Sequence, residues 1–243
     1  IVRQAQVAAQ EGFQEVTLLG QTVNSYTDGK YDFADLLQMI VDVEGIRRVR
    51  FTSPHPSDFS DKVIDVMAAN DKICRFVHLP VQSGSTSVLE AMKRSYSVEE
   101  YMALVDKLRA AMPGLCLSTD VIAGFPGETE MDFEATLALM REVQYDSAFL
   151  FKYSERKGTA AFKALPDTVT EEEKGRRLDA IISLQNAISV EINSGYIGRV
   201  EEVLIQGKAR KGEGMVIGKT DGFKNIVFQR DGAQDNTFVN VEI

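Results

Sequence analysis

One stretch of the sequence, STDVIAGFPGET at residues 118–129, has the features of a strand that ends at a binding site. An apolar, β-branched run leads into a turn with two glycines and a proline, and a helical pattern follows. Glycine lets a backbone approach a ligand closely, but the same turn also fits a purely structural N-cap made by Glu128 or Thr129. Asp120 lies inside the expected strand, where a carboxylate is unfavourable unless it faces a cavity or a partner. The stretch therefore predicts a ligand-binding strand end, with a structural turn as the alternative.

Four other expected strands also end in polar residues. Because the carboxyl ends of parallel strands meet at one edge, we expect all five sets to lie together. They supply amides, hydroxyls, a histidine, a lysine and a carboxylate, and few are hydrolytic nucleophiles with a partnered base. Each set also has a structural explanation of its own, such as a helix cap, a solvated lysine or a structural histidine. Together, the five sets favour binding of a polar cofactor over acid–base hydrolysis. The sets are residues 20–26, 52–56, 80–85, 124–129 and 152–156.

The elements that must position these ends alternate between helix and strand at intervals of roughly thirty residues, which is typical of βα units around a parallel sheet. We expect an α/β fold. The chain opens with a helix that leads into a strand, so the pattern predicts that a preceding strand is missing from this sequence. The expected strands are 14–20, 47–53, 74–81, 115–125 and 146–154, and the expected helices are 1–12, 33–45, 58–70, 87–94, 98–114, 130–143 and 171–195.

The pattern changes after the last long helix. Residues 197–243 alternate in hydrophobicity, are rich in glycine and show no helical period, which predicts a small antiparallel β-barrel. We therefore divide the chain into residues 1–196 and 197–243. The second part carries seven basic and seven acidic residues, so the first part carries the whole net charge of −9. This acidity argues against non-specific nucleic-acid binding but leaves room for a local basic face.

Composition sets further limits. The 243 residues are 44% hydrophobic, enough for a full core, with no apolar run as long as a membrane span and no signal peptide. Cys74 and Cys116 are far apart in apolar surroundings, which predicts buried free thiols in a reducing, cytoplasmic compartment. Two cysteines without a CxxC motif and two histidines do not form a metal site by themselves, so we expect no metal ligand in this chain.

Several runs resemble the radical S-adenosylmethionine (SAM) methylthiotransferases, and the resemblance covers essentially the whole chain. These runs are RVRFTSPHP, HLPVQSGSTSVLEAMKRSYSVEEY, LSTDVIAGFPGETEMDF and FLFKYSERKGT. VNSY, TSPHP, HLPVQSGS and FKYSERKGT look most like the branch that adds a methylthio group to C2 of an isopentenylated adenosine beside the tRNA anticodon. IGKTDGFKNIVF is similar to the TRAM domain, a small β-barrel associated with RNA binding. The implied fold is a partial (βα) radical-SAM, TIM-like barrel followed by a TRAM domain.

The resemblance implies SAM and two [4Fe-4S] clusters as cofactors, tRNA as substrate and an electron donor such as a flavodoxin. One cluster would chelate SAM, whose reductive cleavage gives a deoxyadenosyl radical that removes hydrogen from C2. The second cluster, in an N-terminal domain, would supply the sulfur, which another SAM methylates. The CxxxCxxC loop and the three cysteines of that N-terminal domain are absent from this sequence. We therefore expect a fragment that is inactive alone and contains no catalytic residue of its own.

The resemblance also implies site residues. Gln21 stands where the family meets the SAM amino group, with an amide in place of the usual acid. For the SAM ribose and carboxylate we expect Gln82, Ser83 and Asp120, and for the adenine Phe151 and Tyr153. Further cofactor contacts are expected at Asn24, Ser53, His55, Gly124 and Glu128, and RNA contacts at Lys152, Arg156, Lys208, Arg210, Lys211, Lys219 and Lys224, with Phe223 as a candidate for base stacking.

Three alternatives stay open. The same chemistry fits a ribosomal-protein or a threonylcarbamoyl-adenosine methylthiotransferase, although the TSPHP and HLPVQS runs argue against both. A non-catalytic RNA-binding module with a scaffold barrel is possible if the natural protein also lacks the cluster cysteines. An ordinary βα-barrel lyase or aldolase would be active without iron and without SAM.

Overall fold

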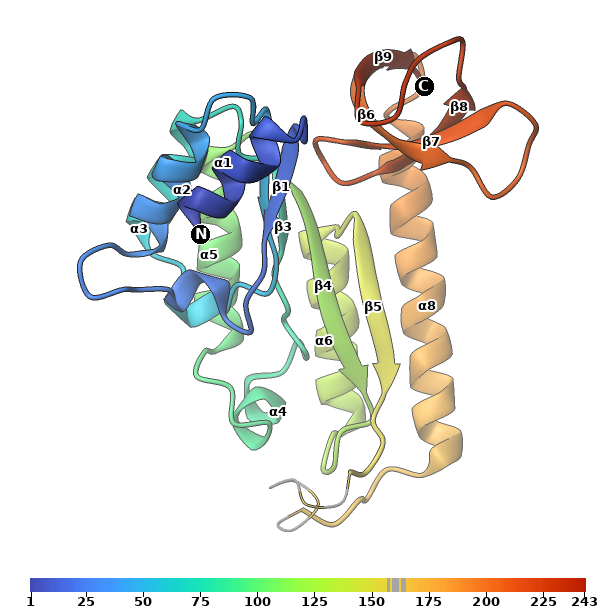
Figure 1. The fold of residues 1–243 in the computed structure, drawn as a ribbon. Coiled ribbons are helices and arrows are strands. Elements are labelled where there is room, and N and C mark those ends of the chain that lie inside the picture. The colour runs from blue at the N-terminus through green and yellow to red at the C-terminus, as the bar shows by residue number, and fades with distance from the viewer. Residues whose placement is uncertain (157, 159–161, 163–164) are drawn as a thin grey trace.

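The computed structural model describes residues 1–156, 158, 162 and 165–243. It contains the expected alternation of helices with parallel strands (Figure 1). Strand β1 (Glu15–Leu18) pairs with β2 (Arg48–Phe51), and β4 (Cys116–Ala123) pairs with both β3 (Phe76–His78) and β5 (Ser147–Lys152). A parallel bridge between Val49 and Ile73 connects the two groups, so the five strands follow one another in chain order.

Five of the described helices begin at a residue whose side chain caps the first turn. Asp32, Ser97 and Thr129 each form a capping box with the third helical residue, and Ser60 and Thr170 cap two further helices. The structural alternative for the turn after residue 123, an N-cap by Glu128 or Thr129, is thus observed at Thr129. The described helices are α1 (Val2–Gln10), α2 (Phe33–Val41), α3 (Asp61–Ala69), α4 (Thr86–Ala91), α5 (Val98–Ala111), α6 (Glu130–Val143) and α8 (Glu171–Ser194), with 3-10 turns η1 (Val23–Ser25) and η2 (Pro56–Asp58).

The core fills the space between the helices and one face of the parallel strands. Leu37 and Ile40 of α2, Val49 of β2 and Leu117 of β4 are fully buried there. Along β5 the pattern is different, because Phe149 and Phe151 are 60% and 51% exposed while Ala148 and Leu150, which alternate with them, are half-buried. Alternation along a strand directs these phenylalanines to the opposite face of the sheet, which we call the inner face.

The C-terminal sheet consists of β6 (Val200–Lys208), β7 (Met215–Thr220), β8 (Asn225–Gln229) and β9 (Phe238–Glu242). All pairings are antiparallel, in the order β8-β7-β6-β9, as the alternating pattern predicted. Within residues 197–243, all of which are described, β8 and β9 form the two edges and do not pair. The sheet is strongly curled (Figure 1) and its edge strands do not pair, so the structure shows the expected antiparallel β-barrel as an open half-barrel.

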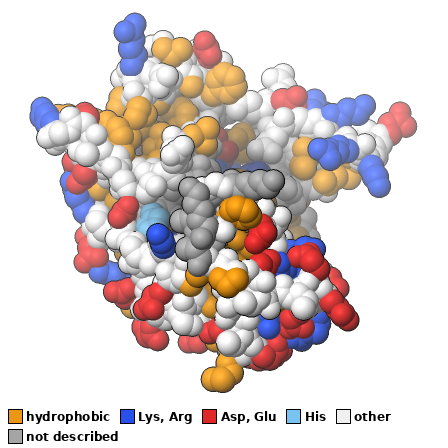
Figure 2. Space-filling view, turned by 90° about the horizontal axis from the view of Figure 1, so that it is seen from below, with side chains coloured by type: hydrophobic (Ala, Val, Ile, Leu, Met, Phe, Trp, Pro, Cys, Tyr) orange, Lys and Arg blue, Asp and Glu red, His pale blue; other side chains and the backbone are white. Residues whose placement is uncertain are grey.

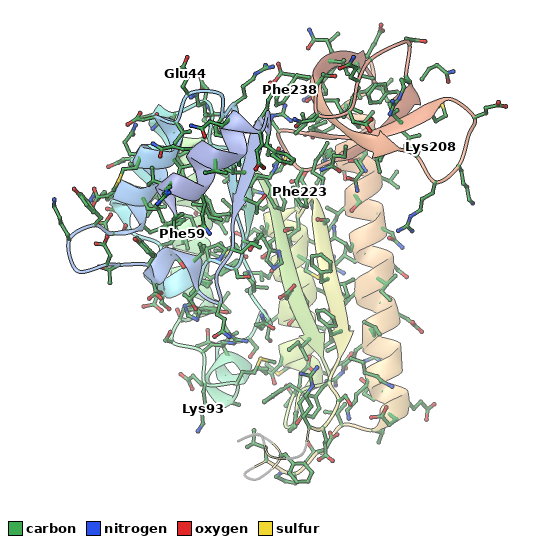
Figure 3. All side chains as sticks on the ribbon, viewed as in Figure 1. Glu44, Phe59, Lys93, Lys208, Phe223 and Phe238 are labelled. Atoms are coloured by element: carbon green, nitrogen blue, oxygen red, sulfur yellow. The ribbon has the colours of Figure 1, made fainter. Side chains whose placement is uncertain are left out.

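The turn between β7 and β8, residues 220–224, inserts at the amino ends of the parallel strands, a contact that we call the junction. Arg50 donates to the carbonyls of Thr220 and Asp221 at 2.7 and 2.8 Å, and the ring of Phe223 stacks on Phe76 with centroids 4.5 Å apart. Figure 3 shows Phe223 between the C-terminal sheet and the upper end of β4. Phe223, a candidate for base stacking, is therefore engaged in the junction.

Gly222 is the tightest point of the junction, because a Cβ built on it would lie 2.6 Å from the sulfur of Cys116. We expect Gly222→Ala to lower the free energy of unfolding by about 1–3 kcal/mol, the usual effect of overpacking a filled core. Urea denaturation measures it. Gly175→Ala on α8 is the matched control, since nothing lies within 4 Å of the Cβ there. Equal stability of the two variants would show that the junction is loosely packed.

Candidate functional site

The carboxyl ends of the parallel strands form one edge, at the bottom of Figure 1, and the C-terminal sheet lies at the other end. The five predicted polar sets follow β1 to β5 and so belong to this edge. Figure 2 looks at the molecule from this side and shows acidic side chains over its lower part and hydrophobic ones above, rather than one continuous basic surface. The edge is thus suited to a ligand held by amides, hydroxyls and rings more than to a polyanion.

The turn after β4, residues 124–128, is held from inside by Glu128. Its buried carboxylate accepts hydrogen bonds from the backbone amides of Gly124 and, at 3.1 Å, Phe125. Arg177 of α8 lies 3.5 Å from the same carboxylate oxygen and donates to the Glu128 carbonyl at 3.0 Å. Burial raises the pKa of Glu128, while Arg177 and the two amides oppose that shift. Glu128, predicted as a direct cofactor contact, instead organises the turn with its carboxylate.

Lys174, one helical turn before Arg177, packs behind Gly124. Its side chain is 2% exposed and forms ion pairs with Asp167 and, at 2.9 Å, Glu171. Gly124 has a φ of +74°, and a Cβ on it would overlap the Lys174 side chain, so only glycine fits this position. The ring of Tyr153 lies 5.5 Å from the ammonium group and 5.2 Å from the ring of Phe125. Tyr153 therefore belongs to the packing around the turn.

Two loops at the edge are tied together by Asn24 and His55. The Asn24 amide donates to the His55 carbonyl and accepts from the His55 amide, both at 2.8 Å. Ser53 and Gln82, which follow β2 and β3, both have left-handed backbones, with φ of 57° and 72°. Such strained residues persist where the surrounding structure fixes them and are common at ligand sites. Ser53 and Gln82 remain candidates for binding, while the amide of Asn24 is used within the protein.

The loop after β3 is fastened to α6. Ser83 is 1% exposed and lies 3.4 Å from the Thr136 hydroxyl, which also accepts from the amide of Gly84 at 2.9 Å. Ser85 donates to the Asp132 carboxylate at 2.6 Å. These contacts make Ser83 a buried support of the loop, which places it behind Gln82 rather than beside a ligand.

Asp132 connects this loop to the start of α6, and the contribution of its carboxylate charge to stability can be measured. Burial alone would raise its pKa, but the hydroxyls of Ser85, Thr129 and Ser87 lower it from 3.8 to about 2. A lowered pKa stabilises the fold above the unfolded value, and this contribution disappears as the pH falls through the folded value. We expect Asp132→Asn to be less stable than wild type in urea at pH 7, and the difference to shrink between pH 4 and pH 2. A constant difference across this range would show that the carboxylate charge is not responsible.

The inner face carries a polar pair, His78 and Asp120. The sequence pattern indicated Asp120 as a site residue but not His78. His78 Nδ1 lies 2.8 Å from the Ser118 hydroxyl, and Nε2 lies 3.5 Å from the Asp120 carboxylate. The ring of Phe149 meets His78 edge-on at 5.7 Å. The alternation of Phe76 and His78 on β3 with Ser118 and Asp120 on β4 was the available signal, because all four positions share one face in register.

The predicted basic residues fall into three groups. Lys152 pairs with Glu171 at 2.7 Å, and Arg156 follows β5 at the same edge. Lys219 lies 3.5 Å above the ring of Phe223, where burial lowers its pKa, and Lys224 pairs with Asp146 at 2.7 Å in the junction. The remaining three, Lys208, Arg210 and Lys211, line a shallow groove of about 640 Å³ on the C-terminal sheet. Figure 3 shows Lys208 far from the strand-end edge.

An apolar groove of about 580 Å³ runs along the open edge of β1. It is lined by Val16, Leu18, Leu19, Val23 and Tyr26, and Leu19 is 77% exposed. A strand that preceded β1 in a chain-order sheet would occupy this position.

The described residues fit SAM better than they fit an iron–sulfur cluster. Gln21, Ser53, His55, Gln82, Gly124 and the exposed ring of Phe151 follow or end neighbouring strands. Cys74 and Cys116 are both buried, as predicted, and among residues 1–156, 158, 162 and 165–243 no three His, Cys, Asp or Glu side chains are grouped to hold a metal. In this same part of the chain no helix is long and apolar enough to span a bilayer.

Comparisons with known proteins identify the family of the chain. Residues 1–140 match the family model of the radical SAM superfamily. The tRNA-2-methylthio-N(6)-dimethylallyladenosine synthase of Carboxydothermus hydrogenoformans is 48% identical over 246 residues, covering 100% of this chain and 56% of that protein. The protein of that name from Chlorobium phaeobacteroides is 48% identical over 238 residues, 97% of this chain and 53% of that protein. The chain thus spans about half the length of the curated relatives it matches.

Solved structures show the fold alone. Coproporphyrinogen III oxidase from Escherichia coli superposes with a TM-score of 0.61 at 16% identity, covering 97% of this chain and 60% of that one. Methylornithine synthase superposes with a TM-score of 0.53 at 14% identity, covering 78% of this chain and 53% of that one. Both show that the α/β part of this chain shares its fold with these proteins.

Proposed function

Because the chain belongs to the radical SAM superfamily, we propose that it is part of a tRNA methylthiotransferase, the enzyme that methylthiolates C2 of an isopentenylated adenosine beside the anticodon. The observation that carries this proposal is 46–48% identity, over nearly the whole chain, to proteins named tRNA-2-methylthio-N(6)-dimethylallyladenosine synthase. The expected surroundings are the cytoplasm, with an electron donor such as a flavodoxin.

Within this proposal, the strand-end edge holds SAM, which supplies the radical chemistry of the superfamily when it is bound. The backbone at Gly124 and the ring of Phe151 would contact the nucleoside, and Gln21 and Gln82 would offer amides to its polar groups. Ser53 and His55 complete this surface. Asn24, Ser83, Glu128 and Tyr153 act indirectly, because internal contacts hold their side chains.

The residues of this chain do not supply the ligands of the iron–sulfur clusters. In the described part of the chain, neither buried cysteine belongs to a group of three or more His, Cys, Asp or Glu side chains that could hold a metal. We therefore propose that residues outside this chain hold both [4Fe-4S] clusters, and that the chain alone does not methylthiolate tRNA. Cluster reconstitution with iron and sulfide, followed by iron analysis, tests this: more than trace iron bound by the chain would contradict it.

For RNA binding we propose the groove lined by Lys208, Arg210 and Lys211 on the C-terminal sheet, in a TRAM-like role. Lys219 and Lys224 support the junction instead. Helix α8 runs from the strand-end edge to this sheet (Figure 1), and its 24 residues measure about 36 Å. A tRNA that contacts both the groove and the edge, including Lys152 and Arg156, must extend over this length.

The deciding experiment is nucleoside mass spectrometry of bulk tRNA from cells with and without the gene that encodes this chain. Loss of the methylthiolated isopentenyl-adenosine, with accumulation of its unmethylthiolated precursor, supports the proposal. An unchanged nucleoside contradicts it and directs attention to threonylcarbamoyl-adenosine and to the ribosomal protein. Codons for a CxxxCxxC loop, found upstream of this sequence in the gene, would exclude the alternative of a non-catalytic RNA-binding module.

A further inference from the structure

The hairpin of β7 and β8 takes part in two different surfaces. Its turn, residues 220–224, occupies the junction, and its strands line part of the groove proposed above for RNA. The hairpin supplies Ile217, Asn225 and Val227 to that groove, beside Lys208, Arg210 and Lys211. Asn225 is also the first residue of β8 and directly follows the turn. The groove and the junction are therefore connected through adjacent residues of one small element.

The turn lies against the inner face at the amino ends of the parallel strands. Val49 of β2 is buried in the helix-covered core, so its neighbour Arg50 lies on the inner face, where it donates to two carbonyls of the turn. Phe76 of β3 stacks on Phe223 and precedes His78 by two residues, a separation of about 7 Å along the strand. The turn therefore forms a floor beneath the His78 level of the inner face.

Free space borders the turn on its other side. A cavity of about 400 Å³ is lined by Phe223 and Lys224 of the turn and by Asn193 and Tyr196 at the end of α8. An ion pair between Lys224 and Asp146, at 2.7 Å, holds the turn on this side. The cavity gives the turn space to leave its contacts while the α/β part stays folded.

Two native thiols lie directly under the turn. Cys116 is 4% exposed, and a Cβ built on Gly222 would lie 2.6 Å from its sulfur. Cys74 is 2% exposed, and the next residue, Arg75, donates its amide to the Asp221 carboxylate at 2.9 Å. Burial raises the pKa of both thiols, to about 11 for Cys116. Buried thiols of this kind are inert, so they react only when the turn moves away.

We propose that RNA bound in the groove holds the β7–β8 turn in place as the floor of the inner face. Displacement of the turn moves Asn225, the next residue, away from the three cations that line the groove. An RNA that contacts both therefore binds the closed hairpin better than the displaced one, and it shifts the equilibrium toward closure. Substrate binding on the C-terminal sheet thus closes the amino end of the inner face to water. The inference rests on the RNA groove of the proposed function.

The test follows alkylation of the two native thiols by N-ethylmaleimide in the full chain, with mass spectrometry of the Cys74 and Cys116 peptides. The ligand is a fluorescently labelled anticodon stem-loop RNA, whose dissociation constant is measured separately by anisotropy. At free RNA of ten times this constant, alkylation of both thiols should slow by about tenfold, because only the RNA-free fraction opens. In Lys211→Gln, which loses one groove cation, the RNA concentration needed should rise in step with the dissociation constant.

Two control variants identify the motion. Without RNA, Phe223→Leu should speed alkylation of both thiols by about three- to tenfold, because it loses the stack on Phe76. Tyr31→Leu removes a ring from the exposed loop before α2 and should leave the rates unchanged. Val105→Cys places a thiol at a fully buried position of α5, where it reacts only when the α/β part unfolds.

Three outcomes count against the inference or its premise. If RNA binds and the rates of Cys74 and Cys116 do not change, the inference is overturned. It is also overturned if RNA slows the thiol of Val105→Cys by the same factor, because the native thiols are then exposed by unfolding of the whole chain. If the chain does not bind the stem-loop at all, the RNA groove of the proposed function is wrong and the inference falls with it.

Discussion

Arg177→Met is expected to lower the free energy of unfolding by about 3–5 kcal/mol, the usual effect of removing one partner of a buried ion pair. The Arg177 side chain is 6% exposed, and the Glu128 side chain that it faces is 2% exposed. Its guanidinium also donates to Glu173 at 2.8 Å and to the Glu128 carbonyl at 3.0 Å. Methionine fills a similar volume but leaves the Glu128 carboxylate buried without its cation. Urea denaturation at pH 7 measures the loss.

The neighbouring arginine provides a matched control. Arg176 is 50% exposed and pairs with Glu130 and Glu173 at 2.6 Å, so Arg176→Met should lose about 1 kcal/mol or less. The double variant Arg177→Met with Glu128→Gln should be more stable than Arg177→Met alone, because a neutral amide avoids the unpaired charge. Equal losses for Arg176 and Arg177, or no recovery in the double variant, would contradict the role of the buried pair.

The sequence was a reliable guide to the elements of the α/β part. Apolar, β-branched runs and capping residues placed a strand at 115–125, observed at Cys116–Ala123, and a helix at 171–195, observed at Glu171–Ser194. These features are local, so they are readable from consecutive residues. The open seam between β8 and β9 was not, because closure of a sheet depends on curvature and register between strands far apart in sequence.

The residues at the strand-end edge of the candidate site were predictable from the sequence. The residues on the inner face of the sheet were predictable only in part. Strand ends mark where a chain leaves a sheet, so the polar residues there were found, including Gln82 and Gly124. His78 was missed because it falls inside the expected strand 74–81 rather than after it, and its contacts are with Ser118 and Asp120 on the next strand. The supporting roles of Glu128 and Lys224 depend on partners 49 and 78 residues away, which no local pattern encodes.

Arg50→Met is expected to have a similarly large effect at the junction, about 3–5 kcal/mol. Arg50 is 3% exposed and donates to the Glu15 carboxylate at 3.0 Å and to the carbonyls of Thr220 and Asp221. Its loss leaves a largely buried carboxylate and two carbonyls without this donor. Because one side chain connects β1, β2 and the β7–β8 turn, we expect the C-terminal sheet to loosen before the α/β part unfolds. Urea denaturation and limited proteolysis after α8 report these two events separately.

The adjacent Arg47 distinguishes burial from charge at the same junction. Arg47 is 48% exposed, pairs with Glu202 at 2.8 Å and lies 3.9 Å from the centre of the Phe238 ring. Arg47→Met removes the same charge from the same junction, but water replaces the lost partner. The free energy of unfolding should therefore fall by about 1 kcal/mol or less, and proteolysis should stay unchanged. If Arg47→Met and Arg50→Met released the C-terminal sheet equally, net charge rather than the buried donors would hold the junction. A large effect of Arg50→Met alone would mean that the groove of Lys208, Arg210 and Lys211 is rigidly placed relative to the strand-end edge, as RNA binding across both requires.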